Sequence, residues 1–116
     1  MTNIDFQTWS KIDLRVAKIL KVEDVENADK LYKISLDVGK EIGKRVVCAG
    51  LKPYYSKDEL KGKKVILFVN LEPRMLKGIE SQGMLLAADN SESGKVALLT
   101  PKVNVNNGSV IEFKND

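Results

Sequence analysis

Short apolar segments separated by turn residues constrain the fold of this chain more than any other feature of its sequence. Within residues 32–38 every second residue is apolar and the residues between are polar, which predicts a strand with one buried face. Residues 65–69 are apolar throughout and predict a strand buried on both faces. Glycine, asparagine or proline occurs between such segments. Many short strands joined by such turns predict a small β-barrel or sandwich.

Other segments fit the same plan. In residues 12–22 the apolar alternation changes phase at Lys18, which predicts a long strand with a bulge or bend. Residues 45–49 predict a further strand, and residues 84–88 and 95–99 predict the two strands of a hairpin. A last strand over residues 110–113 would pair back on the domain.

We expect one domain in this chain of 116 residues, with an N-terminal arm or short helix over 1–11, a barrel over 12–100 and a C-terminal extension over 101–116. Ser56 and Glu59 have the spacing of a capping box, which predicts one further helical turn.

Two absences narrow the function. Histidine is missing, which excludes imidazole-ligated zinc and Ser-His-Asp or Cys-His catalysis. Cys48 is the only cysteine, and its apolar neighbours predict a core position. We therefore expect no catalytic residue, no metal and no cofactor. No apolar run approaches the roughly 20 residues of a membrane span, and charges interrupt any N-terminal apolar region, so a cytoplasmic protein without a membrane partner is expected.

Positive charge is concentrated in the middle of the chain. The formal net charge is +3, and residues 41–80 carry nine cations against five anions. Within residues 70–87, Arg74 and Lys77 have no acid between them, and Gly78 and Gly83 allow close approach of a ligand to the backbone. This segment predicts a binding loop for a phosphate-bearing partner.

Four motifs in this order resemble a known family. They are Asp13 to Ile19, Asn27 to Tyr32, Val47 to Leu51, and Ser81-Gln82-Gly83-Met84. Together they resemble the tRNA-binding domain that is appended to methionyl-tRNA synthetases or stands beside them. The same domain occurs in endothelial monocyte-activating polypeptide and in small free tRNA-binding proteins. The sequence departs from the family at residues 25–26, where Val and Glu stand in place of the usual His-Pro.

The resemblance implies an all-β fold, namely a five-stranded oligonucleotide/oligosaccharide-binding (OB-fold) barrel with a short helix and C-terminal extension strands. In this fold the face of strands 2 and 3 and the flanking loops hold the ligand. Lys33, Ser35 and Arg45 would then lie beside the 74–84 loop. The resemblance also implies a module that binds the folded corner of tRNA without aminoacylating it. It would serve as the accessory (beta) subunit or appended domain of methionyl-tRNA synthetase, with tRNA and the catalytic subunit as partners, and as a homodimer.

The expected RNA-binding residues fall into two groups. The first group comes from the 70–87 segment. The second group contains the secondary candidates Lys30, Lys33, Arg45 and Lys52. Each has a simpler alternative: the cations can be solvated surface, the 81–83 segment a tight turn, and Met84 a core residue. Asn70 either touches RNA or positions the loop. The first group is Arg74, Lys77, Ser81, Gln82, Met84 and Asn70.

Low aromatic content favours recognition of folded RNA. Only 6% of the chain is aromatic, whereas readers of single strands present several stacking rings. Two other classes of function remain open for this chain. One is a secretion-chaperone-like barrel that binds unfolded peptides through an apolar patch. The other is an enzyme on the same barrel, which the lack of histidine and of paired acids opposes.

Overall fold

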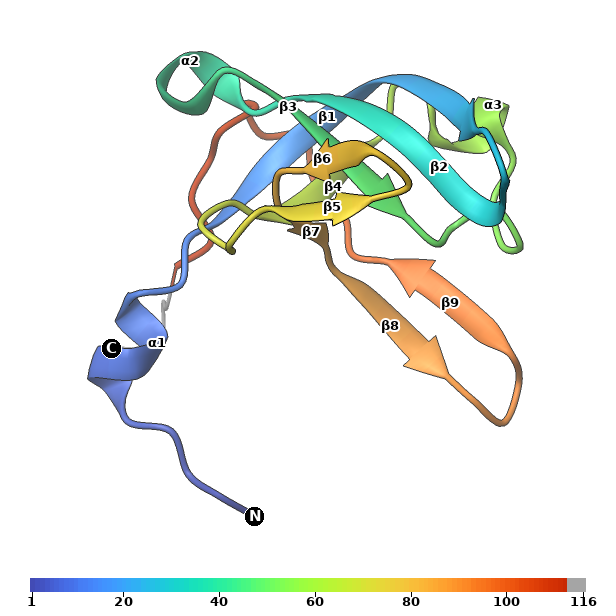
Figure 1. The fold of residues 1–116 in the computed structure, drawn as a ribbon. Helices are drawn as coiled ribbons and strands as arrows, with labels where there is room; N and C mark the ends of the chain where they lie inside the picture. Colours follow the sequence, from blue (N-terminus) through green and yellow to red (C-terminus); the bar gives the residue numbers. More distant parts are fainter. Residues whose placement is uncertain (113–116) are drawn as a thin grey trace.

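The computed structural model describes residues 1–112, and a five-stranded antiparallel sheet dominates them. The strands of this sheet are β1 (Leu14–Val25), β2 (Ala28–Asp37), β3 (Lys44–Ala49), β4 (Lys64–Phe68) and β7 (Met84–Leu85). They are arranged in the order β3-β2-β1-β4-β7. The mostly β architecture predicted from the sequence is thus confirmed (Figure 1). No helix in the described part of the chain is long and apolar enough to cross a membrane.

Strand β1 holds the sheet together because it pairs with two different neighbours. Residues 14–18 pair with β4, and residues 18–25 pair with β2. The register shifts between Ile19 and Lys21, so the bulge predicted from the change of phase is confirmed. A bulge strengthens the local twist, and the long strand can therefore curl from one partner to the other.

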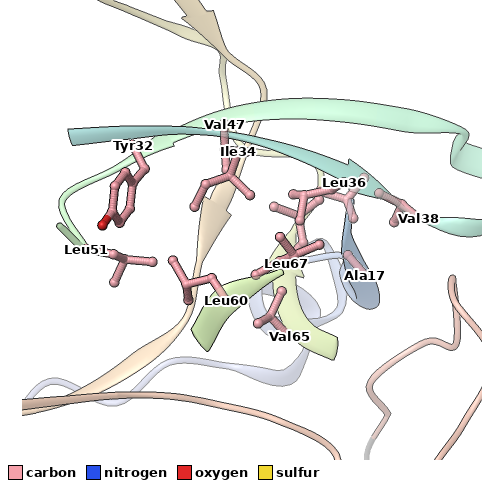
Figure 2. Close-up of a cluster of buried hydrophobic side chains, with 12 residues drawn as sticks. Ala17, Tyr32, Ile34, Leu36, Val38, Val47, Leu51, Leu60, Val65 and Leu67 are labelled. Atoms are coloured by element: carbon pink, nitrogen blue, oxygen red, sulfur yellow. The ribbon is translucent and has the colours of Figure 1, made fainter. Parts of the chain in front are cut away.

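The alternation in β2 builds the core. Tyr32, Ile34, Leu36 and Val38 are at most 5% exposed, while the residues between them are half-buried. They pack with apolar residues of β1, β3 and β4, as Figure 2 shows. The Tyr32 hydroxyl donates a hydrogen bond of 2.8 Å to the carbonyl of Tyr55, which satisfies the one polar atom of this side chain.

Three short helices accompany the strands within residues 1–112: α1 (Phe6–Ser10), α2 (Gly39–Ile42) and α3 (Lys57–Leu60). The capping box at α3 is confirmed, because Ser56 Oγ accepts from the Glu59 backbone and Glu59 Oε1 accepts from the Ser56 backbone. The hydrogen bond from the Ser56 backbone, and next the Ser56 side chain, lower the pKa of the Glu59 carboxyl. Leu60 ends α3 and is buried in the core.

One predicted strand was wrong in its extent. Residues 84–88 do not form a continuous strand, because β7 ends at Leu85 and a new strand, β8 (Ala87–Asn90), begins after Leu86. The Leu86 backbone N–H donates to Ile66, and its carbonyl accepts from Leu99. Strand β8 instead pairs with β9 (Lys95–Leu98) as a hairpin that projects from the main sheet (Figure 1).

The C-terminal segment returns to the start of β1. Val110 forms a single bridge with Arg15, and the Ile111 N–H donates to the Leu14 carbonyl over 2.8 Å. The predicted terminal strand is therefore reduced to a short pairing with β1. Phe113, the last residue of that prediction, lies outside the described residues.

Candidate nucleic-acid interface

The predicted cationic loop forms a β-hairpin. Strands β5 (Arg74–Leu76) and β6 (Ile79–Ser81) pair in register and are joined by Lys77 and Gly78. Both joining residues have positive φ, 51° and 80°, as a tight two-residue hairpin turn of type I′ requires. The hairpin holds Arg74 and Lys77 at the surface, and both are exposed.

Ser81 and Gln82 fasten this hairpin to β3. Ser81 is 5% exposed, and its Oγ accepts a hydrogen bond of 3.0 Å from the backbone N–H of Cys48. Gln82 makes two bonds with Val46: its backbone N–H donates over 2.8 Å, and its Oε1 accepts over 3.0 Å. These polar atoms are hydrogen-bond partners for the backbone at the free edge of β3. In this structure they act as the anchor of the hairpin.

We predict that Ser81→Ala destabilises the protein by about 1 kcal/mol, because the backbone N–H of the half-buried Cys48 loses its acceptor. Chemical denaturation measures this loss. Ser35→Ala is a suitable control, since Ser35 is half-buried and its hydroxyl makes no hydrogen bond within residues 1–112. Equal stability of the two variants would show that the Ser81 anchor contributes nothing.

The hairpin, β3 and the start of β7 surround a cavity of about 200 Å³. Arg74 and Ser81 line it from the hairpin, Cys48 and Gly50 from the end of β3, and Met84 from β7. The side chain of Cys48 is half-buried and not in the core, which corrects the prediction made from its apolar neighbours. Burial raises the pKa of its thiol, and the Lys33 ammonium opposes that shift.

Lys30 and Lys77 line one shallow depression beside the turn between β1 and β2. Both are exposed, and neither takes part in an ion pair within residues 1–112. The fold thus brings together two cations that are 47 positions apart in the sequence. Asp29 also lines this depression, so the two ammonium groups leave it with a net positive charge, which attracts phosphate.

Lys33 and Arg45 lie on opposite faces of the sheet. Lys33 is opposite Cys48 on the outer face, next to the hairpin anchor, whereas Arg45 is opposite Leu36 on the core face. The guanidinium of Arg45 donates to the Val69 carbonyl over 3.2 Å. Arg45 precedes Val46, which bonds to Gln82, so the backbone of Arg45 does lie beside the 74–84 loop. Its role in RNA binding stays a prediction, and its side chain lies on the face opposite to that of Lys33.

Lys52 and Asn70 are engaged in contacts within the protein. Lys52 Nζ lies 3.0 Å from a carboxylate oxygen of Asp24, and Lys57 Nζ lies 2.7 Å from the other. Lys57 and then Lys52 lower the pKa of Asp24 through these bonds. Asn70 accepts from the Asp13 N–H and donates to the Lys11 carbonyl. It thereby ties the end of β4 to the entry of β1.

Two exposed residues of the interface were not predicted. Met75 on β5 is 65% exposed, and Glu72 lines the cavity from the segment before the hairpin. A sequence signal exists for both, since Glu72 is the only acid among the residues from 70 to 79, and Met75 lies between the two cations. Within residues 1–112, no three acidic or cysteine side chains gather as they would around a metal ion.

Comparison with known proteins identifies the family. Residues 14–110 match the family described as "Putative tRNA binding domain". The chain therefore belongs to this tRNA-binding domain family, and the resemblance inferred from the four sequence motifs is confirmed.

One kind of relative is a much longer enzyme. Methionine–tRNA ligases of Pyrococcus horikoshii and Caldanaerobacter subterraneus subsp. tengcongensis are 51% and 54% identical over 111 and 108 residues. These matches include 96% and 93% of this chain, which spans only 15% and 16% of the ligases.

Two solved structures resemble the fold over nearly its full length. The first, a "MetRS related protein" from Pyrococcus horikoshii, has a TM-score of 0.88 at 33% identity and covers 97% of this chain and 100% of its own. The second, the CsaA chaperone protein from Picrophilus torridus, has a TM-score of 0.86 at 35% identity, with 95% and 100% covered.

Proposed function

We propose that this chain is a non-catalytic tRNA-binding module that recognises the folded corner of tRNA. One observation carries the proposal: the rigidly anchored β5–β6 hairpin displays Arg74 and Lys77 without any acidic partner in the described residues, and Lys30 lies beside Lys77. The membership of the chain in a tRNA-binding domain family supports the same ligand. Such a module would work in the cytoplasm, where tRNA is charged.

The anchoring of the hairpin supports RNA binding because a hairpin that is already ordered loses little conformational entropy when the ligand binds. Ser81 and Gln82 hold the hairpin on β3, and Gly83 packs against β4. Cations on a fixed hairpin lose less conformational freedom on binding than cations on a mobile loop. Phosphate contacts made in this way position the RNA without reading its sequence.

We further propose that the sheet is an OB-fold barrel. The strand order β3-β2-β1-β4-β7 leaves β3 and β7 as the two edges, and no ladder joins these edges within residues 1–112. Three hydrogen bonds between β3 and residues Ser81 and Gln82 cross this gap. They support a barrel whose last seam is closed by the residues that lead into β7.

For partners, we propose a homodimer that acts as the accessory beta subunit, or as an appended domain, of methionyl-tRNA synthetase. The similarity to segments of methionine–tRNA ligases supports the synthetase as the partner. Large apolar side chains are exposed on the N-terminal segment, including Ile4 at 72% and Trp9 at 37%, and they support a protein interface there. A domain that holds tRNA near a catalytic subunit raises the local concentration of substrate.

A peptide-binding chaperone is the second candidate. The similarity to the CsaA chaperone protein favours it, as do Met75 and Met84, which are exposed at the same end of the fold. Flexible methionine side chains adapt to varied apolar partners. The unpaired cations of the hairpin are not explained by this function.

The test is binding of the purified protein to folded total tRNA, heat-unfolded tRNA and a single-stranded oligonucleotide, each over a range of salt concentrations. We expect salt-sensitive binding that is confined to folded tRNA. Equal binding to all three ligands would reduce the interface to a generic basic surface. Absence of RNA binding would favour the chaperone.

A further inference from the structure

The cavity beside the hairpin is lined by a carboxylate that a phosphate site does not require. Glu72 and Arg74 both line it, and neither forms an ion pair within residues 1–112. A free carboxylate beside RNA phosphates is repelled by them. Its presence is explained if the carboxylate accepts hydrogen bonds from a neutral part of the ligand.

The remaining lining suits a flat, apolar group. Leu51, Met84 and Leu85 contribute apolar surface against which a base can pack. At about 200 Å³ the cavity is smaller than the 300–1,000 Å³ typical of sites for drug-sized ligands, so it suits one nucleobase and not several nucleotides.

The backbone at Gly50 leaves open space beside the cavity. Gly50 lines the cavity, and a Cβ atom added there would meet no atom within 4 Å. The φ angle of Gly50 lies outside the left-handed region, so the backbone does not itself require glycine. The space beside this edge of the cavity is therefore open without a backbone reason for the glycine.

We infer that this cavity receives one unpaired guanine base of the bound RNA, with the Glu72 carboxylate accepting hydrogen bonds from its Watson–Crick edge. Guanine is favoured because it presents two adjacent N–H donors on that edge, at N1 and N2, which match the two oxygens of a carboxylate. Adenine, cytosine and uracil each lack this pair of donors. The inference rests on the proposed RNA-binding function and adds a base-specific contact to it.

Cys48 provides a direct reporter, because it lines the cavity and is the only cysteine in the chain. We would measure its rate of alkylation by iodoacetamide in the presence of GMP, AMP, CMP or UMP, which carry the same phosphate. At a GMP concentration of twice its dissociation constant, alkylation should be slowed about threefold. The other three nucleotides should protect much less.

One variant and one control sharpen the test. Glu72→Gln should abolish the preference for GMP, because its amide offers only one acceptor oxygen. Glu80→Gln removes an exposed acid from β6 of the same hairpin that does not line the cavity, and it should leave protection by GMP unchanged. Equal protection by all four nucleotides, or a GMP preference that survives in Glu72→Gln, would overturn the inference.

Binding of folded tRNA by the same samples separates the two proposals. If tRNA binds and GMP gives no preferential protection, the guanine site is wrong and the tRNA-binding function stands. If GMP protects Cys48 and tRNA does not bind, the function is wrong, and the cavity is a site for a guanine nucleotide alone.

Discussion

Joint replacement of Arg74 and Lys77 by Ala is expected to weaken binding of folded tRNA about 100-fold, which corresponds to roughly 2.8 kcal/mol at 1.4 kcal/mol per factor of ten. Each side chain is exposed on the anchored hairpin and lacks an acidic partner in the described residues, so each is available for a phosphate. The slope of log affinity against log salt concentration should fall by about one for each lost phosphate contact. Titration of a fluorescent tRNA over several salt concentrations measures both effects.

The matched control is the joint replacement of Lys61 and Lys63 by Ala, which removes the same charge from the loop between α3 and β4. Both lysines are exposed, and neither lines the hairpin cavity or the depression formed by Lys30 and Lys77. A loss as large as that of the hairpin variant would mean that net charge, and not the hairpin, drives binding. Altered discrimination among tRNAs with an unchanged salt slope would contradict phosphate contact.

The hairpin itself could not be predicted from the sequence, although its residues could. Its strands have only three residues each, so no alternation can develop. Its turn places Lys77 at a φ of 51°, whereas the sequence signals for such turns are Asn-Gly or Asp-Gly. The longer elements were predictable because the bulge in β1 and the alternation in β2 follow directly from periodic burial of side chains.

The candidate site shows a second limit of sequence reasoning. Arg74, Ser81 and Arg45 were all predicted to bind RNA on the basis of their polar side chains and of the family resemblance. In the structure Ser81 is used to anchor the hairpin, and Arg45 bonds to the carbonyl of Val69 from the other face. Whether a polar group makes a hydrogen bond within the protein depends on strand register and long-range contacts, which a single sequence does not reveal. Exposure and lack of a partner leave Arg74 as the stronger candidate.

Gly83→Ala should destabilise the protein by about 2–4 kcal/mol, which is large for a change of one methyl group. Gly83 has a φ of 124°, and an added Cβ would lie 2.6 Å from the carbonyl oxygen of Phe68 in the neighbouring strand. That distance is too short, so β4 or the segment that leads into β7 must move. The midpoint and slope of a urea unfolding curve measure the loss.

Gly94→Ala separates backbone strain from this close contact. Gly94 also has a positive φ, 70°, but an added Cβ would meet no atom within 4 Å, so only the left-handed conformation is penalised, by about 1–2 kcal/mol. If the two variants lose equal stability, the close packing of Gly83 on β4 does not exist in solution. If Gly83→Ala loses more, the segment 81–84 is fixed at both ends, by bonds to β3 and by contact with β4. The cations of the hairpin are then presented on a rigid support, which is what shape-specific recognition of a folded RNA demands.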